Sequence, residues 1–248
     1  MKDKLIFDLR DVTYAIDESR STAALNWRAA AGETWALYGP AGSGKSALCS
    51  VFQSLRLIRE GKLKLHFLDG KPEDSVFREV ITVAFTSSLI HRSGSYYQQR
   101  YTPSQIVGVP TVAEYLRLES AGNAAADELL ATFDLTRFRD SACIKLSNGQ
   151  MRKLLIVEAL LKKPSLLILD NPFTGLDMES RRILNDKLAL LVDRGQNIIF
   201  LVNHRREIPA CVTHVLELEN FQVKSILPKD ELPAGDITTN LSSSISAF

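Results

Sequence analysis

The sequence predicts an α/β fold whose core sheet is mostly parallel, and three observations carry this prediction. A short apolar run at 34–38 leads into a glycine-rich turn, after which apolar residues recur at helical spacing. The runs at 80–85, 166–170 and 197–202 are almost continuously apolar, which is typical of strands covered on both faces. The stretch 5–29 carries β signals broken by a charged turn. We therefore expect a parallel core sheet, an N-terminal antiparallel β subdomain and a helical subdomain.

Short β segments open the chain. Residues 5–9 and 12–16 flank a charged pair, and 17–20 has the composition of a turn. Residues 25–29 alternate apolar and polar side chains, which predicts a strand with one buried face, and 62–68 alternates in the same way. We expect the segments that precede the glycine-rich turn to pair as a small antiparallel sheet.

The glycine-rich turn fits the pattern G-x-x-x-x-G-K-[ST] over residues 39–46, between an apolar strand and a helix, which is the context that a phosphate-binding loop requires. Glycines let successive N–H groups face one anion, and the helix N-terminus adds its dipole. We expect Lys45 to reach the β- and γ-phosphates without a role in the core, and Ser46 to bind Mg²⁺. The alternative is a glycine-rich turn with no ligand, which so complete a match disfavours. The predicted nucleotide-binding residues here are Gly39, Pro40, Ala41, Gly42, Ser43, Gly44, Lys45, Ser46 and Ala47.

Tyr14 lies 25 residues before Gly39. An aromatic ring at that position could stack on an adenine base. A tyrosine in a strand is also commonly part of the core. The residues alone leave both interpretations open.

The pattern breaks at 86–110, where a polar, aromatic-rich segment predicts either a base-stacking loop or a folded insertion. The insertion is favoured, because no basic stripe accompanies the aromatics. Helical signals follow: Thr111 and Glu114 have the spacing of a capping box, and 124–135 predicts a second helix.

Three further segments carry polar residues beside apolar runs. Ser147 and Gln150 have the spacing of a capping box for a helix that ends before Pro164. Asp170 closes a short apolar strand, an arrangement in which the carboxylate holds Mg²⁺ beside a phosphate loop. His204 follows the strand at 197–202, and ligands bind at the carboxyl ends of such strands.

Composition limits the classes of protein that fit. A net charge of +1 gives no strong nucleic-acid signal. No apolar run approaches the ~20 residues that cross a bilayer, and the start lacks a secretory signal. The three cysteines have no C-x-x-C spacing, so we expect free thiols. We expect a cytoplasmic protein, with peripheral attachment to the inner face of a membrane as the alternative.

The ordered set of motifs resembles the ATP-binding domain of ATP-binding-cassette (ABC) proteins. Residues 39–46 match Walker A, 166–170 match Walker B, and 146–150 are similar to the L-S-G-G-Q signature, with Asn148 in place of the first glycine. Residues 174–177 match the D-loop, and His204 matches the switch histidine. Tyr14 falls where the family stacks an aromatic on adenine. The segments 145–147 and 171–177 more narrowly resemble the soluble subgroup named for molybdenum-transport and photorepair genes.

The resemblance implies a P-loop NTPase of the ABC type, with one ABC ATP-binding domain over 1–226 and a helical subdomain at about 87–163. Separately, Pro228, Pro233, Gly235 and the run of serines at 242–244 predict a flexible tail at 227–248. The resemblance also implies that two cassettes enclose two ATP molecules head to tail. Ser147, Gly149 and Gln150 would then meet the γ-phosphate across the interface, and Asp177 would contact the opposite protomer. Ser46 and Asp170 would hold Mg²⁺. We expect a homodimer or pairing with another cassette, with a separate membrane subunit as a possible partner.

Two departures from the family pattern bear on activity. The Walker-B carboxylate is followed by Asn171, where the family has a glutamate. An amide orients water but does not accept its proton, and a general base supplies ~10²- to 10⁴-fold, so we expect a slow ATPase. The family's Q-loop glutamine is missing from 85–88, and Gln98 or Gln99 could replace it. Three classes stay open: an ATPase subunit for a membrane component, a soluble ATP-dependent switch, and a nucleic-acid or repair factor. A soluble ABC ATPase is preferred.

Overall fold

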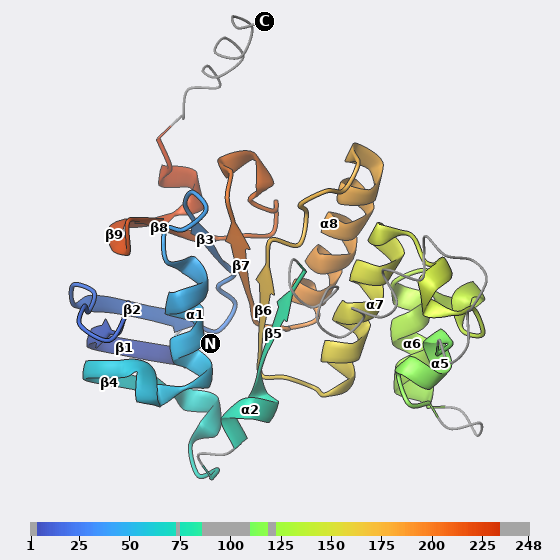
Figure 1. Cartoon of the computed structure of the whole chain (residues 1–248), viewed down its shortest axis with the longest axis horizontal. Helices are drawn as coiled ribbons and strands as arrows, with labels where there is room; N and C mark the ends of the chain where they lie inside the picture. The colour runs from blue at the N-terminus through green and yellow to red at the C-terminus, as the bar shows by residue number, and fades with distance from the viewer. Residues whose placement is uncertain (1–3, 73–74, 86–109, 119–122, 234–248) are drawn as a thin grey trace, which may run out of the picture.

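The structure, a computed structural model, describes residues 4–72, 75–85, 110–118 and 123–233, and its centre is a six-stranded sheet (Figure 1). The strand order is β5-β6-β7-β3-β8-β9, and all neighbours are parallel except β8 and β9. The α/β fold with a mostly parallel core sheet is therefore confirmed. Its strands are β5 (Val80–Ala84), β6 (Leu166–Asp170), β7 (Ile198–Val202), β3 (Trp35–Tyr38), β8 (His214–Glu219) and β9 (Gln222–Pro228).

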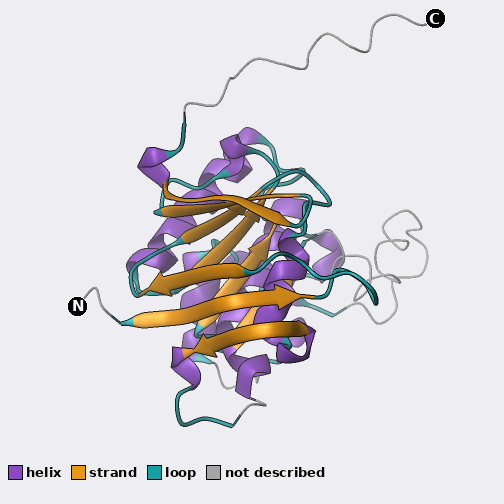
Figure 2. Cartoon of the chain, turned by 90° about the vertical axis from the view of Figure 1, so that its left-hand side faces the viewer, coloured by secondary structure: helices purple, strands orange, loops and turns teal. Residues whose placement is uncertain are grey.

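A second, antiparallel sheet has the order β2-β1-β4, and its three strands cross the front of Figure 2. They are β1 (Leu5–Tyr14), β2 (Leu25–Ala30) and β4 (Ile58–Leu65). The two segments expected at 5–9 and 12–16 form one strand, because the charged pair between them makes an irregularity rather than a turn. Asp11 there has φ 51°, and its carbonyl lies so close to Gly61 that a Cβ on Gly61 would come within 2.3 Å.

The helices begin at several of the residues that the sequence indicates. Thr111 caps α5 in a capping box with Glu114, and Ser147 caps α7 in a capping box with Gln150. In Figure 1, α5, α6 and α7 form a group on the far side of β5 and β6 from α1. The helices are α1 (Lys45–Gln53), α2 (Val76–Glu79), α5 (Val112–Tyr115), α6 (Ala124–Thr132), α7 (Asn148–Leu161) and α8 (Met178–Asp193).

Two hydrophobic clusters cover the two faces of the parallel sheet. In β6, Leu167 and Leu169 join the cluster that includes α7, while Leu166 and Ile168 join the cluster that includes α1 and the antiparallel sheet. All five residues of β7 are buried, as expected for a strand between β6 and β3. The same expectation is wrong for β5. It lies at the edge of the described sheet, and only its Val80 and Val83 are buried.

The predicted boundary between the domain and a tail at residue 226 is also wrong. Leu227 pairs with Val215 of β8, and β9 continues to Pro228. Leu232 packs against the cluster on the α7 side of the sheet. In the part of the chain that the structure describes, none of the helices is both long and apolar enough to cross a membrane.

Candidate nucleotide site

Three parallel strands bring the predicted site segments to one edge of the sheet. β7 lies between β6, which carries Asp170, and β3, which leads into the phosphate loop. The amide of Asn171 donates to the carbonyl of Leu201 at 2.9 Å, and the amide of Gly39 donates to the carbonyl of Val202 at 3.3 Å. Segments that are far apart in the sequence are therefore held side by side at the carboxyl ends of the strands, where ligands bind in such sheets.

The phosphate loop needs glycine for conformation and for space. Gly42 and Gly44 have φ of 80° and 100°, which side chains rarely adopt. A Cβ on Gly39 would lie 2.0 Å from the carbonyl oxygen of Leu218. Gly44 is the N-cap of α1 and offers no side-chain cap. The first N–H groups of α1 are thus left for another acceptor, which is the property that lets a helix N-terminus bind an anion.

Lys45 is buried, with 5% of its surface exposed. Its Nζ donates to the carbonyls of Gly39 at 2.6 Å and Pro40 at 2.8 Å, and to Ser43 Oγ at 3.2 Å. Burial lowers the pKa of this amine, while the charge of Asp170 acts to raise it. We expected Lys45 to have no role in the core, but its ammonium group is buried and bonded to the loop that surrounds it.

Ser46 and Asp170, the two predicted metal ligands, are in contact. Ser46 Oγ donates to Asp170 Oδ2 at 2.8 Å. The other carboxylate oxygen of Asp170 accepts a hydrogen bond from Asn171 Nδ2 at 2.6 Å. A hydroxyl and a carboxylate are oxygen donors of the kind Mg²⁺ prefers, and Mg²⁺ is commonly held by one or two protein ligands together with phosphates. The residues present therefore fit Mg²⁺.

Asn171 has a left-handed backbone, with φ 54°. Asparagine tolerates this conformation better than most residues. Its Nδ2 is engaged by Asp170, whereas its Oδ1 is buried and has no hydrogen-bond partner among the described residues. The side chain thus keeps one unused acceptor, an amide oxygen, which can accept a hydrogen bond but is not a base at neutral pH.

Arg152 supports the same segment, and the sequence analysis missed it. It is 7% exposed, and its guanidinium lies 5.0 Å from the ring centroid of Phe85. Burial lowers its pKa. Its Nη1 donates to the carbonyls of Asn171 and Pro172, each at 3.2 Å, and its Nη2 donates to the carbonyl of Thr174. Arg152 thereby fixes the loop that joins Walker B to the D-loop.

A signal for Arg152 was present in the sequence. Ile156 and Ala159 lie four and seven residues further along α7, on the same helical face, and both are buried. A basic residue on an apolar face at that spacing indicates a buried cation, although the carbonyls that surround it could not be identified from the pattern.

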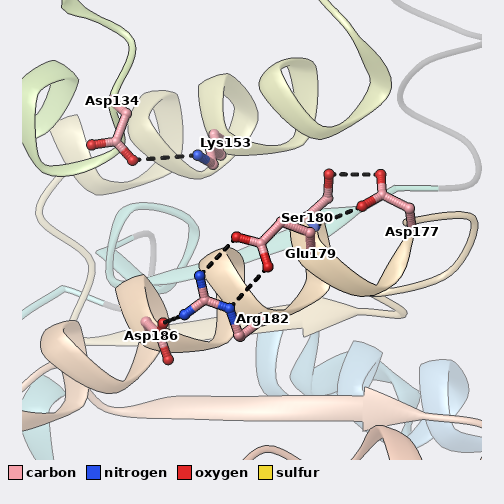
Figure 3. Close-up of polar contacts among 7 residues, drawn as sticks. All are labelled: Asp134, Lys153, Asp177, Glu179, Ser180, Arg182 and Asp186. Atoms are coloured by element: carbon pink, nitrogen blue, oxygen red, sulfur yellow. Dashed lines mark hydrogen bonds and ion pairs between the residues drawn. The ribbon is translucent and has the colours of Figure 1, made fainter.

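The signature and D-loop residues act as helix caps in this chain. Ser147 Oγ accepts from the amide of Gln150 at 3.2 Å, at the start of α7. Asp177 caps α8, accepting from the amide and the hydroxyl of Ser180 at 2.8 Å each (Figure 3). Those bonds lower the pKa of Asp177. A Cβ on Gly149 would meet Ser180 Oγ at an ordinary 3.6 Å, so the two helix starts are adjacent.

The flank of α8 carries further ion pairs away from the sheet edge. Arg182 bridges Glu179 and Asp186, and Lys153 of α7 lies 3.5 Å from Asp134 (Figure 3). The Arg182 pairs are internal to α8, and the Lys153 pair joins α7 to the segment that follows α6; all of them lie outside the predicted site. His204 is exposed and follows β7, and it takes no part in the hydrogen bonds that join the phosphate loop, Asp170 and Asn171. The candidate Gln98 and Gln99 lie outside the described residues.

Tyr14 lies at the end of β1 and is 2% exposed. Its hydroxyl has no hydrogen-bond partner among the described residues, and burial raises its pKa. It also lines a pocket of about 250 Å³ with Thr22, Phe221 and Gln222, next to the phosphate loop. The burial agrees with the core interpretation, and contact with adenine stays a prediction.

Tyr14→Phe is expected to raise the free energy of unfolding by about 1 kcal/mol, because it removes a buried hydroxyl that lacks a partner. The affinity for MgATP should be unchanged, whereas Tyr14→Ala should weaken it by ~1–3 kcal/mol if the ring contacts the base. Thermal melts and calorimetry measure the two effects. Tyr115→Phe is the control, since the Tyr115 hydroxyl donates to Glu158 at 2.7 Å and its loss should destabilise the protein. A loss of stability in Tyr14→Phe would contradict the interpretation that the buried Tyr14 hydroxyl has no hydrogen-bond partner.

Comparisons with known proteins agree with this architecture. The family model described as ABC transporter matches residues 22–174. An uncharacterised ABC transporter ATP-binding protein of Schizosaccharomyces pombe is 30% identical over 84% of this chain and 44% of that protein. The ABC transporter ATP-binding protein ModF of Escherichia coli is 30% identical over 89% of this chain and 44% of ModF. The chain thus spans less than half the length of both relatives.

Solved structures resemble the fold closely. The structure of cbiO1 from Clostridium perfringens, described as part of the ABC transporter complex cbiONQ, superimposes with a TM-score of 0.75. The match covers 92% of this chain and 90% of that one, at 19% sequence identity, and therefore bears on the fold alone. Together with the matched family model, these findings confirm the resemblance seen in the motifs. The chain belongs to the family of ABC transporter ATP-binding proteins.

Proposed function

We propose that this chain binds MgATP at its phosphate loop and hydrolyses it slowly when two cassettes pair head to tail. The observation that carries the proposal is the contact of Ser46 Oγ with Asp170 Oδ2 at 2.8 Å. It joins the Walker A and Walker B segments through two oxygen ligands directly beside the uncapped start of α1. Few functions other than holding a metal–phosphate group use this combination of parts.

Each residue has a defined task in the proposed site. The first N–H groups of α1 and the ammonium group of Lys45 bind the phosphates, and Lys45 exchanges its loop carbonyls for phosphate oxygens. Ser46 and Asp170 hold Mg²⁺, which supplies charge neutralisation on the phosphates. Asn171 orients water through its amide oxygen but does not take its proton. Turnover is therefore slow, and His204 is the remaining candidate for proton transfer.

Pairing of two cassettes is supported by where the signature lies. In Figure 1, α7, which Ser147 caps, lies on the opposite side of β5 and β6 from α1, which begins at the end of the phosphate loop. A second cassette, related by a two-fold axis, would present its signature to this loop. We expect the second cassette to be either another copy of this chain or a different cassette.

A membrane subunit is the second candidate for the output of the site. Similar proteins are named as a zinc uptake system ATP-binding protein and an Fe(3+) ions import ATP-binding protein. Co-purification with an integral membrane protein would favour this role and a position at the inner face of the membrane. Salt-sensitive binding to nucleic acid would favour the repair alternative. We prefer a soluble ABC ATPase and leave its output open, with an ATP-dependent switch as a further alternative.

Size-exclusion chromatography with light scattering tests the pairing. The chain is expected to be a monomer without nucleotide and a dimer with MgATP. Gly149→Asp is the matched variant: the site has room for a Cβ, and the added charge would oppose the γ-phosphate of the partner's nucleotide. It should bind MgATP and stay monomeric. A dimer that forms equally without nucleotide, or one that Gly149→Asp leaves intact, would contradict the head-to-tail arrangement.

A further inference from the structure

The β8–β9 hairpin lies against the phosphate loop at two points. The carbonyl of Leu218, near the end of β8, occupies the space in which a Cβ of Gly39 would lie. At the hairpin's tip, the amide of Phe221 donates to the carbonyl of Ser43 at 2.9 Å. The Phe221 ring lies against Gly44, where a Cβ would come within 2.6 Å of its Cδ1. The hairpin therefore packs against the phosphate loop near both of its ends.

Phe221 occupies a backbone position that disfavours it. Glu219 pairs with Gln222, so Asn220 and Phe221 form a two-residue turn, with φ of 49° and 62°. A turn of this kind favours asparagine followed by glycine, because both residues have positive φ. An aromatic residue at the second position is strained. A residue that keeps a strained backbone while its side chain packs on a ligand-binding loop suggests a role in that loop.

We propose that Phe221 is a positioning residue for nucleotide binding, holding the peptide between Ser43 and Gly44 in its anion-binding orientation. In a trans peptide the C=O and N–H groups point in opposite directions. The bond from Phe221 fixes the Ser43 carbonyl toward the hairpin, so the N–H of Gly44 points away from the hairpin. The ring blocks the space behind Gly44 and prevents the loop from turning back. This inference rests on the proposed binding of MgATP at the loop.

Two substitutions separate the ring from the backbone strain. Phe221→Gly and Phe221→Ala both remove the ring and keep the N–H group, but only glycine relieves the positive φ. We expect MgATP affinity to fall about tenfold in both, which corresponds to 1.4 kcal/mol. The glycine variant should nevertheless melt about 2–4 °C above the alanine variant. The two variants would then differ in melting temperature but not in MgATP affinity.

Asn220→Gly is the matched control, because it relieves strain in the same turn and leaves the ring in place. It should bind MgATP with unchanged affinity. Calorimetry with MgATP and thermal melts without nucleotide measure all four proteins. Wild-type affinity in Phe221→Gly, or affinities that simply follow the melting temperatures, would overturn the role of Phe221. Absence of MgATP binding by the wild-type protein would instead overturn the proposed function.

Discussion

Lys45→Ala is expected to weaken MgATP binding by about 30-fold or more. Truncating one partner of a buried, hydrogen-bonded charge pair costs about 2–5 kcal/mol, and 1.4 kcal/mol is a factor of ten. The Nζ of Lys45 is already placed inside the loop, bonded to Gly39, Pro40 and Ser43. No reorganisation beyond a change of acceptors is needed for it to meet phosphate oxygens. Isothermal calorimetry with MgATP measures the loss.

The same three bonds mean that Lys45→Ala also removes support from the loop, so the variant's fold has to be checked. Circular dichroism and thermal melts serve for this, and Lys62→Ala is the matched control. Lys62 is exposed on β4, in the antiparallel sheet, and its loss should leave MgATP affinity unchanged. A folded Lys45→Ala protein that binds MgATP as the wild type does would contradict the assignment of the loop.

The sequence was informative where a local pattern decides the structure. The glycine-rich loop between β3 and α1 and the capping boxes at Thr111 and Ser147 depend on residues within a few positions of one another. Continuous apolar runs correctly indicated β6 and β7. The contact of Ser46 with Asp170 also agrees with the sequence motifs, since both motifs follow the carboxyl ends of parallel strands in one sheet.

Residues whose position depends on distant segments were missed or left open. The role of the Phe221 ring depends on its contact with Gly44, which lies far away in the sequence. The role of Arg152 likewise depends on its hydrogen bonds to the carbonyls of Asn171 and Thr174. Tyr14 could not be assigned, because burial of a strand residue depends on what packs over it. The tail boundary was wrong because Pro228 suggested an end, yet a proline is tolerated at the terminus of an edge strand such as β9.

Replacing Asn171 is expected to give the largest gain in turnover. Its amide bonds Asp170 at 2.6 Å, so a carboxylate placed there would lie beside the metal ligands and could accept a proton from water. Asn171→Glu should raise the rate of ATP hydrolysis by at most the ~10²- to 10⁴-fold that a general base supplies. The MgATP-bound dimer should become shorter-lived, because hydrolysis opens it. Steady-state phosphate release and dimer dissociation measure the two effects.

Asn171→Gln is the control that isolates the carboxylate. Glutamate and glutamine have the same length, and each replaces asparagine at φ 54°, so each carries a similar backbone cost of about 1–3 kcal/mol. Only glutamate adds a base, and only it should raise the rate. In the native background, His204→Ala should remove the residual activity. Equal rates in the glutamate and glutamine variants, with brisk hydrolysis by the native protein, would place the base elsewhere, and the Gln98–Gln99 segment would be the first to test.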